Sequence, residues 1–185
     1  MERNLLIIGA GIYGLVACEI AFDMECFSKI GFADSSREFT VDGRRVTGST
    51  DDLDRLTADY QCAVVAIGNP KVRLSLIERL EQARYDVISL ISPRAYISPS
   101  VKIESGCIIE PMAVVQSACV LEKGCILSAG SVVNHGSKCC AGVHVDINAT
   151  VAGCSLVPAG TKVSSGEVYK GMSISIEDLF ETVKA

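Results

Sequence analysis

The sequence contains two histidines, His135 and His144, which stand nine residues apart. An imidazole has an ordinary pKa of about 6.5, so near neutral pH it can take a proton from an amine or a hydroxyl group. Nine residues after His144 comes Gly153, and an unshielded glycine N–H is suited to hold the oxyanion of an acyl-transfer intermediate. Although a lone histidine is more often structural, these three residues together predict a site for base-assisted acyl transfer.

A second candidate site is the glycine-rich segment 9–14, which reads GAGIYG and stands between a strand-like run and a helix-like run. Its spacing has the form of a dinucleotide-binding turn, in which glycines let a phosphate approach a helix N-terminus. Asp34 follows about twenty residues later, where a ribose-binding acid belongs. NAD(P) is therefore one interpretation, but the unit of about 90 residues is short for two mononucleotide halves. A close-packed turn without a ligand is the other alternative.

The elements that position these residues divide into two halves. Over residues 1–90, strand-like and helix-like runs alternate, which predicts a small Rossmann-like parallel sheet covered on both faces by helices. The expected strands are 5–8, 29–33, 62–67 and 86–91, and the expected helices are 13–22, 50–56 and 71–83.

From residue 91 onward, in the second half (91–185), the pattern changes to a period of six that ends near Val168. Every sixth residue from Ile97 to Val163 is apolar, and the residue two places earlier in each unit is small or β-branched. Hexapeptide self-similarity is the signature of a parallel β-helix, with three units to a coil of 18 residues. A β-sandwich is the alternative, but its strands alternate with a period of two. A short helix over 174–183, with Ser175 as its N-cap, is expected to end the chain.

The β-helix bears directly on the two histidines. Neither His135 nor His144 stands in the apolar series, and nine residues are half a coil. The two imidazoles are therefore expected on different walls of one subunit, facing apart, so a shared site needs a second subunit.

Composition excludes several classes of function. The net charge of −5 and the pI near 5.1 argue against binding to a nucleic-acid backbone. No apolar run is long enough for a membrane span, and no secretory signal precedes the first strand, so we expect a cytoplasmic protein. The nine cysteines lack CxxC spacing, which disfavours metal or disulfide sites. Four of them occupy inward positions of the repeat and are expected to be small core residues: Cys107, Cys119, Cys125 and Cys139.

The repeat, with Asn134-His135, His144 and Ala152-Gly153, resembles the left-handed β-helix acyltransferases. The segments 9–14 (GAGIYG), 31–34 (GFAD) and 66–69 (AIGN) are similar to those of the NeuD/PglD-type sugar acetyltransferases, and the likeness covers nearly the whole chain. The resemblance implies a Rossmann-like nucleotide-sugar-binding domain over 1–90 and a left-handed parallel β-helix over 91–185.

The resemblance also implies an activity. Acetyl-CoA would lie between neighbouring subunits of a homotrimer, and the acceptor would be a nucleotide-linked aminosugar, with UDP as its nucleotide. His135 would be the general base as the amine attacks the thioester directly, His144 would lie near the thioester, and the Gly153 amide would hold its oxygen. No metal is implied. The residues expected to bind the nucleotide-sugar are Gly9, Gly11, Ile12, Tyr13, Asp34, Ser35, Gly68 and Asn69.

This sequence departs from the family pattern at two places. Relatives often carry an acid directly after the first histidine, where this chain has Gly136, which leaves Asn134 or Asp146 as the orienting partner. The segment 168–172 (VYKGM) differs from the usual ending near the CoA. Alternatives are O-acetylation of a sugar, of sialic acid or of serine, and a non-catalytic trimeric nucleotide-binding scaffold. A γ-type carbonic anhydrase needs three histidine ligands and is excluded.

Overall fold

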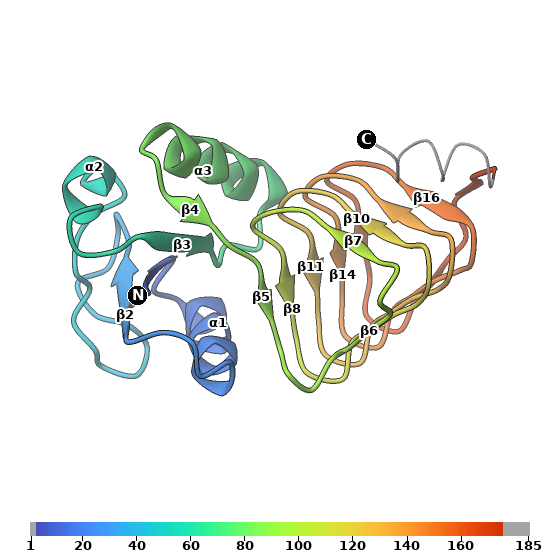
Figure 1. The fold of residues 1–185 in the computed structure, drawn as a ribbon, viewed down its shortest axis with the longest axis horizontal. Coiled ribbons are helices and arrows are strands. Elements are labelled where there is room, and N and C mark those ends of the chain that lie inside the picture. Colours follow the sequence, from blue (N-terminus) through green and yellow to red (C-terminus); the bar gives the residue numbers. More distant parts are fainter. Residues whose placement is uncertain (1–2, 176–185) are drawn as a thin grey trace.

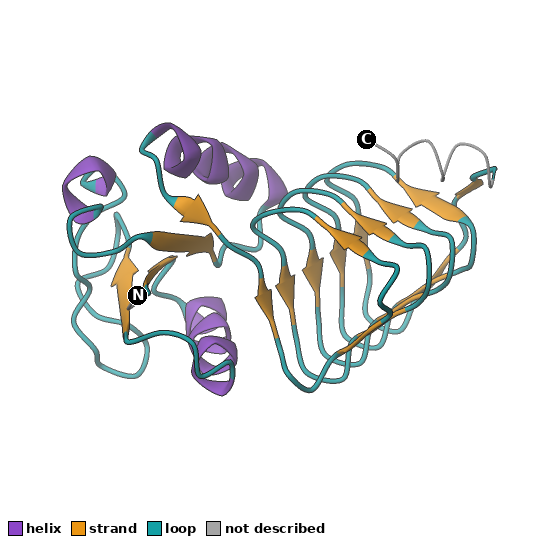
Figure 2. Cartoon of the chain, viewed as in Figure 1, coloured by secondary structure: helices purple, strands orange, loops and turns teal. Residues whose placement is uncertain are grey.

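A computed structural model describes residues 3–175 of the chain. Two units lie side by side, an N-terminal β/α unit and a prism of stacked coils (Figure 1). Helices occur only in the first unit of the described chain, and the second consists of short strands joined by turns (Figure 2). The fold predicted from the sequence, a small parallel β/α unit followed by a parallel β-helix, is confirmed. The expected helix over 174–183 falls almost entirely on residues outside the described part.

The N-terminal unit is built on a four-stranded parallel sheet in the order β2-β1-β3-β4. Its strands are β1 (Asn4–Ile8), β2 (Lys29–Ala33), β3 (Cys62–Val65) and β4 (Asp86–Val87). β1 and β3 are central and almost wholly buried, as expected for continuous apolar runs covered on both faces. The predicted strand over 86–91 is divided: β4 ends this sheet, while the next residues, from Leu90, pair with the β-helix.

Helices cover the two faces of this sheet. α1 (Ile12–Asp23) packs with Leu5, Ile7 and Val64, whereas α3 (Pro70–Gln82) and the short α2 (Leu53–Leu56) pack with the opposite face. α3 begins where its sequence predicts, because Asn69 caps it by accepting hydrogen bonds from the backbone N–H groups of Lys71 and Val72. Pro70 fits the first turn, where its missing N–H costs nothing.

The β-helix has three walls, each a five-stranded sheet. The first wall contains β5 (Leu90–Ile91), β8 (Ile108–Ile109), β11 (Ile126–Leu127), β14 (His144–Val145) and β17 (Lys162–Val163). The second wall contains β6 (Tyr96–Ile97), β9 (Val114–Val115), β12 (Val132–Val133), β15 (Thr150–Val151) and β18 (Val168–Tyr169). The third wall contains β7 (Lys102–Ile103), β10 (Val120–Leu121), β13 (Lys138–Cys139), β16 (Ser155–Val157) and β19 (Met172–Ser173).

Parallel pairing with an 18-residue offset stacks the coils, as when Ile126 pairs with both Ile108 and His144. The predicted apolar series lines the interior, and its members from Ile109 to Val163 are fully buried. The four cysteines predicted as small core residues are fully buried among them. All nine cysteines are free thiols. The period of six is therefore a packing requirement of the prism.

The two units meet along the first wall and one corner of the prism. Outward side chains of the first wall, Leu90, Ile108 and Ile126, are fully buried in the same cluster as α1. α3 runs along the corner between the third and first walls, where stacked glycines have positive φ. A Cβ atom at Gly124 would lie 2.9 Å from Ile77 Cδ1. Glycine is needed there both for the turn and for the approach of the helix.

Leu127→Ala tests the interior of the prism. Leu127 is fully buried, and truncating such a side chain removes transfer free energy and leaves a cavity. We expect the free energy of unfolding to fall by about 2–5 kcal/mol, measured by denaturant titration. Glu78→Ala on the exposed side of α3 is the control and should change it by less than about 0.5 kcal/mol. Equal effects of the two substitutions would contradict this packing.

Candidate active site

His135 lies in the turn that follows β12, at the corner between the second and third walls. Its Nδ1 lies 2.7 Å from Asn134 Oδ1, which also accepts a hydrogen bond from the His135 backbone N–H at 2.8 Å. Because an amide oxygen only accepts, Nδ1 carries the proton and Nε2 is left with a free lone pair. Asn134 thus orients the imidazole, and Asp146 interacts with other residues.

Gly153 stands one coil beyond His135, in register with it. The next residue, Cys154, donates its backbone N–H to the His135 carbonyl at 2.9 Å. A Cβ atom added at Gly153 would lie 3.1 Å from both Cε1 and Nε2 of His135, so a side chain there would crowd the unprotonated nitrogen. The structure therefore brings the predicted base and the predicted oxyanion donor together within one subunit.

His144 is placed differently, on the outer surface of the first wall in β14. Its Nε2 lies 3.0 Å from Ser128 Oγ and 3.9 Å from Asp146 Oδ1. Burial lowers the pKa of His144 to about 4, although Asp146 acts in the opposite direction. Lys162 Nζ pairs with Asp146 at 2.8 Å, and this hydrogen bond lowers the pKa of Asp146 to about 2. His144 is therefore an uncharged imidazole beside an anion that a lysine already neutralises.

The two histidines lie on different walls, as their half-coil spacing predicts: His144 is on the first wall, and His135 is at the far border of the second wall. His135 follows β12 where this wall ends, and Asp146, after His144, precedes β15 where it begins. The outward side chains between these borders are apolar or β-branched and partly or largely exposed: Tyr96, Val114, Val132, Thr150 and Val168. Met112 and Ile147 continue this apolar surface and are exposed by 73% and 51%.

A cleft of about 550 Å³ lies at the carboxyl end of the parallel sheet, where ligands of open α/β sheets bind. Of the predicted nucleotide-sugar residues, Gly9, Asp34 and Ser35 line it. Five others are not among the lining residues: Gly11, Ile12, Tyr13, Gly68 and Asn69. Gly68 and Asn69 form the turn into α3, while the Tyr13 hydroxyl is buried where the two units meet.

Asp34 holds the glycine-rich turn in place beside this cleft. Its Oδ2 accepts the Ala10 backbone N–H at 2.9 Å, and its Oδ1 accepts the backbone N–H and the hydroxyl of Ser36 at 2.8 Å. Burial acts to raise the pKa of Asp34, but these hydrogen bonds outweigh it and lower the pKa. The carboxylate therefore shapes one rim of the cleft.

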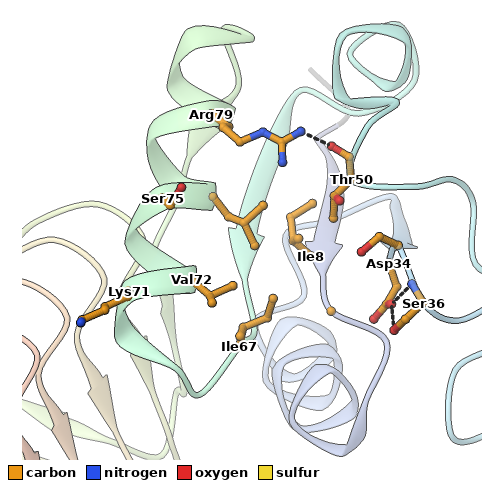
Figure 3. A pocket seen from close by; sticks show the side chains of 12 residues that line it. Ile8, Asp34, Ser36, Thr50, Ile67, Lys71, Val72, Ser75 and Arg79 are labelled. Carbon is orange, nitrogen blue, oxygen red and sulfur yellow. Dashed lines mark hydrogen bonds between the residues drawn. The ribbon is translucent and has the colours of Figure 1, made fainter.

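The opposite rim comes from α3 and was not predicted. Lys71, Ser75 and Arg79 stand four residues apart on one face of the helix. Arg79 donates to the Thr50 carbonyl at 2.7 Å, which ties the helix to the loop that closes the cleft. Figure 3 shows the Arg79 side chain reaching across to Thr50, while Lys71 extends away from Asp34. The i, i+4 spacing of polar residues was the only signal of this rim in the sequence.

Within residues 3–175 no group of three or more histidine, cysteine or acidic side chains could hold a metal ion. No helix in that range is long and apolar enough to cross a membrane.

The chain is similar to proteins of one known family. A family model described as the PglD N-terminal domain matches residues 4–80. The acetyltransferase domain of PglB from Neisseria gonorrhoeae FA1090, solved in complex with acetyl coenzyme A, is 30% identical, with a TM-score of 0.87 over 92% of this chain and 83% of that chain. The chain belongs to the NeuD/PglD-type sugar acetyltransferase family. Its fold is accordingly a Rossmann-like unit followed by a left-handed parallel β-helix.

More distant members of the NeuD/PglD-type fold also match. A mutant of perosamine N-acetyltransferase from Caulobacter crescentus, in complex with CoA and GDP-perosamine, is 22% identical, with a TM-score of 0.59 over 89% of this chain and 90% of that chain. WeeI from Acinetobacter baumannii AYE is 18% identical, with a TM-score of 0.57 over 90% and 88%. At these identities the likeness concerns the fold. No curated protein matches the chain.

The depressed pKa of His144 makes a prediction about pH. The folded protein holds this pKa at about 4, whereas the unfolded chain has an ordinary imidazole value of about 6.5. Between these values only the unfolded state binds the proton, so the free energy of unfolding should decrease as the pH falls through this range. His144→Gln should remove this part of the pH dependence in denaturant titrations. An NMR titration of the His144 ring with a midpoint near the ordinary value would contradict the prediction.

Proposed function

We propose that this protein transfers an acetyl group from acetyl-CoA to the amino group of a nucleotide-linked aminosugar. The observation that carries the proposal is the geometry at His135, where Asn134 fixes the protonated nitrogen and Nε2 faces Gly153. The PglB acetyltransferase domain in complex with acetyl coenzyme A supports the donor. The perosamine N-acetyltransferase in complex with CoA and GDP-perosamine supports the class of acceptor.

The proposed reaction is direct attack on the thioester. The sugar amine adds to the thioester carbonyl, and His135 Nε2 takes the proton that the nitrogen loses. The Gly153 backbone N–H, which donates to no other described residue, stabilises the oxyanion of the tetrahedral intermediate. When the intermediate collapses, the C–S bond breaks and the imidazolium returns its proton to the departing sulfur. His144, uncharged at neutral pH, positions the acetyl group by hydrogen bonding.

The chemistry of Asn134 favours an amine acceptor over a hydroxyl. A carboxylate beside Nδ1 would stabilise the imidazolium and strengthen the base, whereas the neutral Asn134 amide supplies orientation without a negative charge. A neutral amine is already nucleophilic, and its proton becomes acidic once the N–C bond forms. A hydroxyl needs its proton removed as it attacks. A base oriented by a neutral amide, as His135 is by Asn134, is therefore sufficient for N-acetylation.

We propose that the second wall is the contact surface of a homotrimer. A cyclic trimer uses a heterologous interface, in which one border of a surface meets the opposite border on the next subunit. His135 stands at one border of the second wall, and His144 stands on the first wall, next to the corner that forms the other border. Packing on the second wall would bring the His135 of one subunit toward the His144 of the next, with acetyl-CoA in the groove between the prisms. The apolar side chains of this wall would be buried in the assembly.

The cleft in the N-terminal unit is proposed to hold the nucleotide-sugar. Gly9, Asp34 and Ser35 form one rim with the hydroxyl groups of Ser36 and Thr50 nearby, and the start of α3 forms the other. The positive end of the α3 dipole lies on this rim at Lys71 and Val72 and favours a diphosphate. We propose UDP as the nucleotide. Because the perosamine enzyme takes a GDP-linked sugar, the assays below include both nucleotides.

His135→Ala tests the assigned base. Loss of general base catalysis should lower kcat by about 10²- to 10⁴-fold, measured as CoA thiol release with GDP-perosamine and with UDP-linked aminosugars. Stabilisation of the variant by acetyl-CoA in a thermal shift assay should match that of the wild type, because the side chain is not needed to bind the donor. Unchanged turnover would overturn the assignment. Stabilisation of the wild type by neither acetyl-CoA nor nucleotide would indicate a non-catalytic scaffold.

Val132→Glu tests the trimer. A carboxylate in the middle of the second wall would be desolvated between subunits, so the trimer should dissociate into monomers and turnover should fall with it. Light scattering after size-exclusion chromatography measures the assembly. Val41→Glu, which places the same charge at a valine that is 51% exposed on the N-terminal unit, should leave both unchanged. A Val132→Glu trimer with wild-type turnover would refute the interface.

A further inference from the structure

Arg73, in the first turns of α3, joins the two units of the chain through hydrogen bonds. Its side chain is fully buried. Nη1 donates to the carbonyls of Ile67 and Gly68 in the N-terminal unit, at 2.7 and 2.8 Å. Nε and Nη2 donate to the carbonyls of Gly124 and Gly142 in two successive coils of the β-helix, both at 2.8 Å. One guanidinium therefore binds four backbone carbonyls from both units.

A buried cation of this kind is costly to the fold. Burial lowers the pKa of Arg73, and within the described chain no carboxylate pairs with it. The partial negative charges of four carbonyls replace the water that the guanidinium has lost. An apolar side chain of similar length would fill the same space without the desolvation cost. Packing alone therefore does not explain an arginine at this position, whereas its ability to form directional hydrogen bonds does.

The apolar contacts between α3 and the β-helix do not by themselves fix the position of the helix along the prism. Ile77, Leu74 and Pro70 lie against the corner glycines, which repeat every coil as Gly106, Gly124, Gly142 and Gly160. Apolar contact is non-directional, and a repeating corner offers nearly the same surface at each level. Hydrogen bonds depend on distance and angle. Two directional contacts remain: the partly exposed ion pair between Glu81 and Lys123, at the end of α3, and the buried bonds from Arg73 to Gly124 and Gly142. Because the Arg73 bonds are buried, they determine most strictly which coils face the start of α3.

These carbonyls connect the two halves of the proposed reaction. Ile67 lines the cleft proposed for the nucleotide-sugar, and Gly68 leads from it into α3. Gly142 stands two residues before His144, which begins β14. A hydrogen-bonded path from the floor of the cleft to the coil of His144 thus runs through the Arg73 side chain.

We propose that Arg73 is a positioning residue that sets the register of the nucleotide-sugar cleft against the coil that carries His144. This rests on the function proposed above. A bound substrate must reach from the cleft to the acetyl group, and adjacent coils are about 4.8 Å apart. A slip of a fraction of that spacing would misplace the amine, and a misplacement of about 1 Å lowers a rate by about 100-fold.

Arg73→Met separates register from stability, with Arg84→Met as the matched control. Arg84 is exposed and follows the end of α3. CoA release is measured with GDP-perosamine or a UDP-linked aminosugar, whichever the wild type uses, and with a free aminosugar that does not occupy the cleft. For Arg73→Met, kcat with the nucleotide-linked acceptor should fall about 30- to 100-fold while kcat with the free aminosugar changes less than about 3-fold. Arg84→Met should change neither. An equal loss of kcat with both acceptors would mean that Arg73 only stabilises the fold, and would overturn the proposal.

Amide hydrogen exchange gives a second readout that does not depend on activity. In Arg73→Met, segments 66–73 and 140–146 should lose protection together, while the second wall keeps its protection. Loss of protection in only one segment, or in neither, would overturn the proposal. If Arg73→Met does not fold, Arg73→Lys carries both tests. Lysine keeps the charge but has a single nitrogen that cannot span four carbonyls. For Arg73→Lys we therefore expect smaller losses, both of kcat with the nucleotide-linked acceptor and of exchange protection in the two segments.

The two proposals fail separately. A wild-type protein that releases no CoA with any nucleotide-linked aminosugar would refute the proposed function. The exchange experiment would still decide whether Arg73 joins the cleft to the coil of His144.

Discussion

Stacking of identical coils is the constraint on which the rest of this structure depends. Most strands of the prism are only two residues long and could not persist alone. They are stable because each pairs with the strand 18 residues before and after it while its apolar residue fills the common interior. The same offset places Gly153 against His135. The proposed base and oxyanion donor therefore meet through the repeat itself, without a dedicated loop.

The two histidines have different polar partners. Asn134 orients His135 with an amide, and burial keeps His144 neutral beside an Asp146 that Lys162 neutralises. An acetyl-CoA thioester and a free amine are both neutral at their reacting atoms. In the proposed reaction the oxyanion is therefore the principal charge that develops, and a backbone amide is suited to stabilise it.

Periodic features of this chain could be predicted from the sequence, because the 18-residue register is a local rule repeated many times. This register predicted the apolar series that lines the interior, the buried cysteines, and the placement of His135 and His144 on different walls. The features that depend on tertiary packing could not be predicted. The division of the strand over 86–91 and the buried Arg73 arise where the two units meet. The α3 rim at Lys71 and Arg79 arises from the packing of α3 against the loop at Thr50 within the N-terminal unit. The choice of Asn134 over Asp146 as the orienting partner required the side-chain geometry at the corner.

Because the coils are similar, a chain of this fold can gain or lose a whole coil during evolution. Inserting or deleting one coil of 18 residues between the first coil and Gly124 would preserve every rule of stacking, and the prism would still close. It would nevertheless present a different pair of coils to the start of α3 and move His135 and His144 one level along the axis. In evolution, the β-helix can thus change length freely on the side away from the N-terminal unit. Between that unit and the histidines, the number of coils sets the distance from the cleft to His135 and His144, so a change there would alter the spacing of the two proposed sites.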